Sequence, residues 1–249
     1  MFNKAFFFLC VLASYSINAQ IKNSENLVRE MHKKYAGNFN ANITFIQLNQ
    51  DFDSTGKGGK HNMSFEAFHY PGKFRNDFGV TPGKDGYIIT NDTMYIFENG
   101  KFKSKKYCIF DVGLLTGDIY FMRVDDAIEK LKKLNYNLTE FREDIWKERP
   151  VYVVGAKKGD EKSPQFWIDK QELYVVRNIA ISAEDGQLED QHYCEHAKVE
   201  SAWVEERVEI FMNGKKAKKE HYAEVKANNE LDLNIFNPRL FTKLHWRNK

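Results

Sequence analysis

The chain has 249 residues, of which 42% are hydrophobic and 29% are charged. This length suits one domain, because β-rich single domains often run to about 200 to 250 residues. The formal net charge of +2 argues against a nucleic-acid partner, since binding to phosphate backbones requires a strongly basic surface.

The N-terminus has the pattern of a secretory signal peptide. It reads MFNKAFFFLCVLASYSINAQ, with one lysine, an apolar run from Ala5 to Leu12, and Asn18-Ala19 before Gln20. We predict a signal peptide over residues 1–19, cleaved after Ala19. Its apolar core is shorter than the roughly 20 residues that a membrane-spanning helix needs. Cys10 lies inside that core and not at the cleavage point, so no lipid anchor is expected, and residues 20–249 are expected to form one exported, monomeric domain.

Two segments have the periodicity of amphipathic helices. The first opens at Ser24, places Leu27, Val28, Met31 and Tyr35 on one stripe and ends at Gly37; the second is RVDDAIEKLKKLNY, residues 123–136. A short helical turn is expected in residues 137–144. The closing LDLNIFNPRLF is expected to be a short packed tail in which Pro238 ends any helical turn.

The rest of the chain alternates as strands do. About eleven strands are expected, in ANITFIQLNQ, HNMSFEAFHY, KFRNDFGV, DGYIIT, TMYIFENGKF, RPVYVVGAK, SPQFWID, LYVVRNIAIS, HYCEHAKVE, AWVEERVEIFM and KEHYAEVKA. Asn99-Gly100 and Asn213-Gly214 predict type I′ hairpin turns, which need positive φ at both central residues. Short turns between alternating strands predict an antiparallel sheet, and this many strands must curl or close.

The stretch FEAFHYPGKFRNDFG, residues 65–79, is apolar on both faces of its predicted strands. Two helices of about fourteen residues span only about 20 Å each, which is too little to cover one whole face of such a sheet. The concave side is therefore expected to hold either a second sheet folded back or a ligand with a large apolar surface. The aromatic residues predicted to line it are Phe65, Phe68, Tyr70, Phe74, Phe78, Tyr87, Tyr95, Phe97, Tyr152, Phe166 and Trp167.

Candidate chemistry is sparse. The run HYCEH places His192, Cys194 and His196 on one strand face, but no further ligand matches them, so no metal site is predicted. Acidic residues are scattered over the strands, among them Glu66, Asp77 and Glu205, and are expected on the solvated face. A glycosidase needs two carboxylates at a fixed separation, and the sequence selects no such pair. An exported protein can form a disulfide between Cys108 and Cys194, although the sequence cannot show that the two are close enough.

Four segments, taken in order, resemble a known family. They are SFEAFHYPGKFRNDF, DGYIITNDTMYIFENGKF, PQFWIDKQELYVVRNIAI and YAEVKANNELDLNIFNP. They resemble the LolA-like outer-membrane lipoprotein-sorting proteins, whose pattern is matched by Pro71 to Arg75, by Asp85-Gly86 with Tyr95, by Phe166 to Asp169 and by Asp232 to Pro238. The similarity spans about residues 26–238.

The resemblance implies a mainly β fold with few helices, an open and curved antiparallel half-barrel whose concave face is plugged by helices. It also implies a periplasmic carrier that binds acyl chains of lipids or lipoproteins without covalent catalysis or a cofactor. The implied partners are an inner-membrane ATP-driven (ABC) exporter and an outer-membrane acceptor. Arg75 matches, loosely, an arginine thought to tie the lid to the sheet. The alternatives are a secreted hydrolase acting on envelope glycan through paired carboxylates, and a purely structural β module.

Overall fold

The computed structural model describes residues 21–182 and 186–247. The predicted signal peptide therefore lies outside the described residues. The helices are α1 (Ser24–Tyr35), α2 (Asp111–Thr116) and α3 (Val124–Lys133), with three short 3-10 turns, η1 (Asp118–Tyr120), η2 (Leu233–Phe236) and η3 (Pro238–Leu240). The strands are β1 (Asn42–Phe52), β2 (Gly58–His69), β3 (Lys73–Phe78), β4 (Asp85–Thr90), β5 (Thr93–Glu98), β6 (Lys101–Tyr107), β7 (Phe141–Trp146), β8 (Arg149–Val154), β9 (Gln165–Asp169), β10 (Val175–Ile181), β11 (Leu188–Val199), β12 (Ala202–Met212) and β13 (Lys215–Ala227).

Both predicted helices are confirmed, and a third is present. The Asn23 side chain caps α1 by accepting a hydrogen bond from the Asn26 amide at 2.8 Å. The predicted stripe of α1 is buried, as are Ile128 and Leu131 of α3. Helix α2 has only six residues, too few for a helical period to show in the sequence. None of the described helices is both long enough and apolar enough to cross a membrane.

The sheet contains two strands beyond the eleven expected. One is β6, the second arm of the hairpin at Asn99-Gly100, where both residues have positive φ as predicted. The other is β7, which lies where a helical turn was expected, in residues 137–144. The Asn213-Gly214 turn also has positive φ at both positions, so both hairpin predictions are confirmed.

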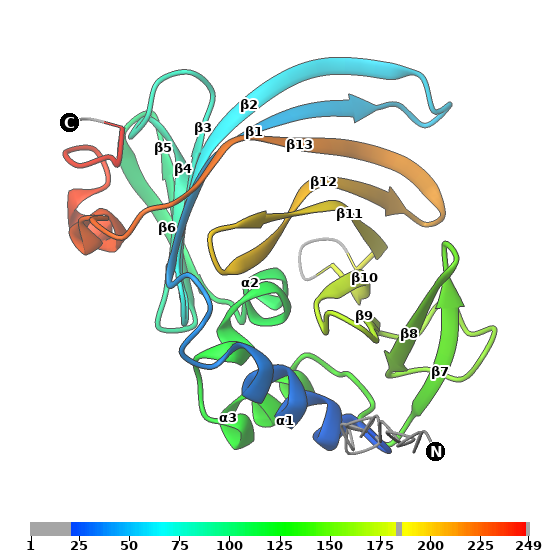
Figure 1. Ribbon diagram of the computed structural model, residues 1–249. Helices are drawn as coiled ribbons and strands as arrows, with labels where there is room; N and C mark the ends of the chain where they lie inside the picture. Colours follow the sequence, from blue (N-terminus) through cyan, green and yellow to red (C-terminus); the bar gives the residue numbers. More distant parts are fainter. Residues whose placement is uncertain (1–20, 183–185, 248–249) are drawn as a thin grey trace, which may run out of the picture.

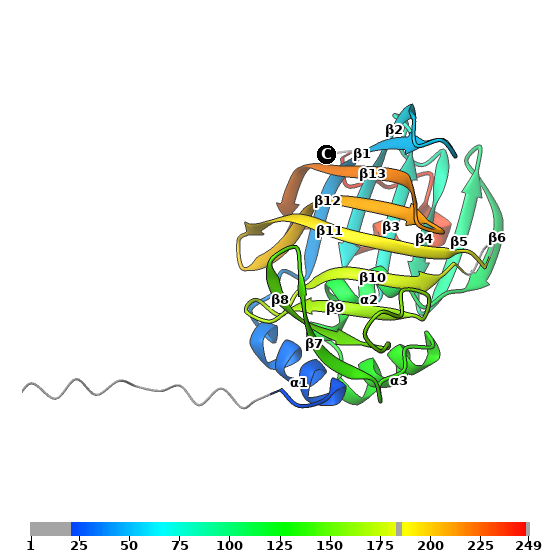
Figure 2. The ribbon, with the colours of Figure 1, turned by 90° about the vertical axis from the view of Figure 1, so that its right-hand side faces the viewer.

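All thirteen strands form one antiparallel sheet in the order β6-β5-β4-β3-β2-β1-β13-β12-β11-β10-β9-β8-β7. The two edge strands, β6 and β7, are not paired with each other, so the sheet is an open half-barrel and the predicted fold class is confirmed. Figure 1 shows the sheet arching over the three helices, and Figure 2 shows the strands from β7 to β13 crossing one wall of the arch. We call the face that meets the helices the concave face.

The opposite, convex face is covered in part by the last stretch of the chain. We call residues 228–247 the C-terminal segment; it lies outside the arch beside β3, β4 and β5 (Figure 1). Ile235, Phe236 and Phe241 of this segment pack with Ala67, Ile88 and Phe97 of the sheet, all buried. The two apolar faces predicted for residues 65–79 are therefore both covered, one by helices and one by the chain's own end.

Candidate binding site

The predicted aromatic side chains divide between the two faces of the sheet. Those in the concave core, with the helices, are Phe68, Tyr70, Phe74, Tyr87, Tyr152 and Phe166. Four others lie on the convex side. Phe65 contacts His245 and Trp246, and both Tyr95 and Phe97 pack with the C-terminal segment. Trp167 belongs to a separate cluster with Val151 and Tyr174. Phe78 is 48% exposed at the end of β3 and contacts the Tyr87 ring.

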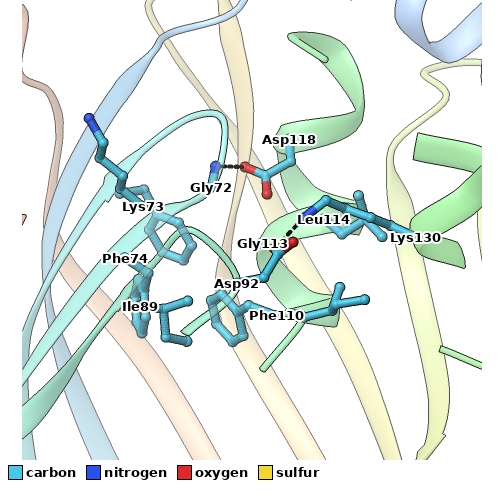
Figure 3. A pocket seen from close by; sticks show the side chains of 12 residues that line it. Gly72, Lys73, Phe74, Ile89, Asp92, Phe110, Gly113, Leu114, Asp118 and Lys130 are labelled. Carbon is cyan, nitrogen blue, oxygen red and sulfur yellow. Dashed lines mark hydrogen bonds and ion pairs between the residues drawn. The ribbon is translucent and has the colours of Figure 1, made fainter. Parts of the chain in front are cut away.

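A pocket lies between the concave face of β2–β4 and α2 (Figure 3). Its space, including the part open to solvent, is about 340 Å³. Antiparallel pairing places Phe68 opposite Phe74 and Phe74 opposite Ile89, so these side chains stand in a row on one face. Phe110, just before α2, lies against that row, with its ring 4.8 Å from Phe74 and 6.1 Å from Phe68. We call residues 110–133, which contain α2, η1 and α3, the helical segment. The pocket therefore has an aromatic floor to which the helical segment contributes Phe110.

The rim of this pocket is polar. Asp118 of η1 accepts a hydrogen bond from the Gly72 amide at 2.7 Å, and Lys130 of α3 pairs with Asp92 (Figure 3). Burial raises the pKa of Asp118 to about 7. These two contacts join the helical segment to the turns that follow β2 and β4, so they hold the helices over the sheet.

A second pocket adjoins the first through Phe68, which lines both. Its space, including the part open to solvent, is about 250 Å³. Its other lining residues are Phe39, Ile43, Phe45, Tyr70, Thr116, Trp203, Val204 and Glu205. The Phe45 ring stacks on Tyr222 of β13 with centroids 4.2 Å apart. The two pockets form a discontinuous apolar interior beneath the helices.

Carboxylates also line this interior, contrary to the expectation that strand acids face solvent. Glu66 is 4% exposed, and Glu205 and Glu220 are 8% exposed. Asp77 is also fully buried, but on the opposite face of the sheet, where it pairs with Arg75. Burial raises the pKa of Glu66 and raises that of Glu205 and Glu220 to about 7. The burial of Glu66 could have been predicted from the sequence, because Glu66 lies two residues before Phe68 and so shares its face of the strand.

Arg75 points away from this interior and binds the C-terminal segment. Its guanidinium pairs with Asp77 at 2.6 Å and donates to the carbonyl oxygens of Ile235, Phe241 and Leu244 at 3.0, 2.8 and 2.7 Å. Burial alone would raise the pKa of Asp77, but hydrogen bonds from Arg75 and His245 hold it below its usual value. The contacts of Arg75 therefore join the sheet to the chain's end, and not to the helices over the concave face.

The residues weighed for metal binding and for a disulfide have other neighbours. His192 lies 3.2 Å from Asp190, Cys194 lies 3.7 Å from the Lys147 ammonium, and His196 contacts the Val175 carbonyl at 3.1 Å. Among the described residues, no three metal-ligating side chains converge. Cys108 and Cys194 are both free thiols.

Comparison with known proteins bears on the fold. No family model and no curated protein matches the sequence. Solved structures do: an outer membrane lipoprotein-sorting protein domain from Vibrio parahaemolyticus has TM-score 0.58 at 11% identity and covers 88% of this chain and 98% of its own. A DUF1329 family protein from Desulfovibrio piger has TM-score 0.57 at 12% identity over 88% of this chain and 97% of its own. A LolA superfamily protein from Nitrosomonas europaea has TM-score 0.54 at 9% identity over 84% and 96%.

The chain has a LolA-like fold. The predicted resemblance is thus confirmed at the level of architecture. At such low identity the likeness shows the fold alone. The ligand that this LolA-like fold binds depends on the side chains in its own interior.

Proposed function

We propose that this protein is an exported, non-enzymatic carrier that binds the acyl chains of lipids or lipoproteins on the concave side of its half-barrel. The observation that supports the proposal is the pocket floored by Phe68, Phe74 and Phe110 beneath a helical segment held by a few polar contacts. Sites for small apolar ligands are concave, mainly apolar and few per protein.

The size of the pocket suggests how loading works. The pocket is nearly filled in the empty state, since its roughly 340 Å³ include open solvent and its enclosed part has room for about one water molecule. A full acyl chain therefore requires α2 and Phe110 to withdraw. Each methylene that enters contributes about 0.8 kcal/mol, so about ten methylenes contribute about 8 kcal/mol against the loss of the aromatic contacts that fill the empty state.

The destination and the partners follow from the same proposal. The Vibrio protein that shares this fold is described as a lipoprotein-sorting protein, and the chain starts with a predicted signal peptide cleaved after Ala19. We place the mature monomer in the periplasm, where it receives its ligand from an inner-membrane ABC exporter and delivers it to an outer-membrane acceptor.

A glycan hydrolase is the less favoured function. The two carboxylates that line the larger pocket already have partners, since Asp92 pairs with Lys130 and Asp118 accepts the Gly72 amide. A glycosidase needs one carboxyl as a proton donor and another as nucleophile or base beside a sugar-sized cleft. The rest of the pocket is mainly apolar, with Phe68, Phe74 and Phe110 in its lining.

Native mass spectrometry of the mature chain, purified from its own periplasm without detergent, tests the carrier function. We expect a bound mass in the range of a lipid or acylated peptide that is lost on denaturation. A bare chain that also takes up no neutral fluorescent acyl probe after delipidation contradicts the proposal.

Two variants on one strand face sharpen the test. Phe74→Glu places a charge in the pocket floor, and we expect it to abolish retention of the acyl probe while the far-ultraviolet circular dichroism of the sheet is kept. Phe78→Glu is the matched control, because Phe78 lies on the same face of β3 but is 48% exposed. Equal retention in both variants would place the ligand elsewhere.

A further inference from the structure

The smaller pocket contains a carboxylate that has no side-chain partner. Glu205 lines it together with Phe45, Phe68 and Tyr70, and is 8% exposed. Among the described residues, the one hydrogen bond to its carboxylate comes from its own backbone amide. A buried carboxylate is normally paired or hydrogen-bonded to several donors, because desolvating it is costly. Glu205 thus leaves most of its hydrogen-bonding capacity directed into an apolar pocket.

Further acidic groups lie in the same interior. Burial raises the pKa of Glu66, Glu205 and Glu220. Repulsion from Glu220 and Glu205 raises the pKa of Glu66 further, and repulsion from Glu220 raises that of Glu205 further. Glu66 accepts hydrogen bonds from Ser64 and Asn76 at 3.2 and 2.7 Å. The cation beside this group is Lys218, 3.7 Å from Glu220 and 39% exposed at its side chain. The interior therefore carries more acidic than basic groups.

Aromatic faces accompany these carboxylates. Phe45 is paired with Glu66 across β1 and β2, and the Phe45 ring stacks on Tyr222. Glu205 lines the same pocket as Phe45, Phe68 and Tyr70. Carboxylates next to aromatic faces are the chemistry by which proteins recognise an ammonium group, because the ring quadrupole attracts cations.

From this geometry we propose that the amphiphile carried in the concave interior has a positively charged amine at its polar end, with the ammonium beside Glu205 and the chain over Phe68. The inference rests on the carrier function proposed above and specifies its ligand. An anionic head group would be repelled by Glu66, Glu205 and Glu220, and the cation paired with Glu220 among the described residues, Lys218, is 39% exposed at its side chain. An ammonium supplies the donors that Glu205 lacks, in a pocket where such hydrogen bonds are strong.

Three ligands with the same alkyl chain separate head group from chain. Titration calorimetry of the delipidated mature protein uses dodecylamine, dodecanol and dodecanoic acid below their micellar concentrations. We expect the amine to bind about tenfold or more tighter than the alcohol, the range of a charge-assisted hydrogen bond, and the acid to bind most weakly. Glu205→Gln, which keeps the side-chain shape, is expected to remove the preference for the amine and to leave the alcohol unchanged.

The controls keep the two proposals separable. Glu129→Gln on α3 removes one exposed acidic charge that lines neither pocket and should change none of the three affinities. Glu220→Gln gives a second interior variant if Glu205→Gln is unstable, and it should weaken the amine alone. If all three ligands bind equally, or if the preference survives in both interior variants, the amine inference is wrong while the carrier function stands. If none binds, both are overturned.

Discussion

Arg75 is the largest side chain that the fold buries completely. It pairs with the buried Asp77. Arg75 donates hydrogen bonds to three carbonyl groups of the C-terminal segment, and Asp77 accepts one from the Gly83 amide. A buried ion pair is not by itself a source of stability, because desolvation offsets the attraction. Here the pair fixes where the chain's end lies.

Replacing Arg75 tests that role. Arg75→Met removes the guanidinium and leaves Asp77 buried without its main partner, a loss that costs about 3 to 5 kcal/mol of unfolding free energy. Urea unfolding followed by tryptophan fluorescence measures it. Arg239→Met, at an exposed arginine of η3, is the control and should change stability by less than about 0.5 kcal/mol. A loss of unfolding free energy in Arg75→Met as small as that expected for Arg239→Met would show that Arg75 is dispensable.

Glu205 makes the ligand-free protein sensitive to pH. Its pKa is about 7 in the folded chain against the ordinary value of 4.5. Between these two values the folded state holds a proton that the unfolded state has released, so stability falls as pH rises through this window. The loss attributable to this carboxyl is about 3 kcal/mol.

Glu205→Gln removes this contribution, because glutamine does not titrate. We expect the variant and the native chain to be equally stable near pH 4.5 and the variant to be the more stable above pH 7. Urea denaturation across that range measures both. Glu220 also has a pKa raised to about 7 by burial, so part of the fall of stability with rising pH remains in the variant. Parallel stability curves for the two proteins would mean that Glu205 does not hold its proton in the fold.

At the scale of elements, the short helix α2 depends on how closely it approaches β2. Gly117 follows α2, and a Cβ atom there would lie 2.1 Å from the ring of Tyr70. The Tyr70 hydroxyl in turn lies 3.3 Å from the Thr116 hydroxyl. Glycine is therefore required at this contact by the space available rather than by an unusual φ.

Gly117→Ala should lift α2 from the sheet. We expect faster amide hydrogen exchange over residues 111–120 and stronger uptake of an acyl probe, because Phe110 is carried away with the helix. Thr116→Val, which removes one hydroxyl without adding bulk, is the matched control and should leave exchange nearly unchanged. Protection at α2 that is the same in Gly117→Ala as in the native chain would rule out this contact as the fastening point.

How far the sequence determines these elements depends on their length. Long periodic segments such as residues 24–35 and 124–133 were predictable from pattern. Strand β7 was not, because FREDIW carries three consecutive charged residues, Arg142, Glu143 and Asp144, which hide the alternation typical of a strand. The same limit applies to the site. Alternation along a strand divides the aromatic residues between two faces, but which face meets the helices and which meets the C-terminal segment depends on contacts far apart in the sequence, and no local pattern encodes that.

At the scale of the whole molecule, the C-terminal segment acts as the cover of the convex face. Ending the chain after Ala227 would expose Ala67, Ile88 and Phe97 together, an apolar patch on a sheet, which favours association. We expect the shortened protein to self-associate in light-scattering measurements while its concave pocket still binds the acyl probe. A monomer as stable as the full chain would contradict this.

The strand order also defines what sets the width of the arch. Closed barrels have a diameter fixed by strand number and shear, whereas β6 and β7 of this sheet share no hydrogen bonds. The chain passes from one edge to the other through α2 and α3, so the helical segment is a tether between the two free edges. We expect that releasing the helices would change the width of the arch without breaking any strand pairing, so that the proposed carrier could accept ligands of different thickness.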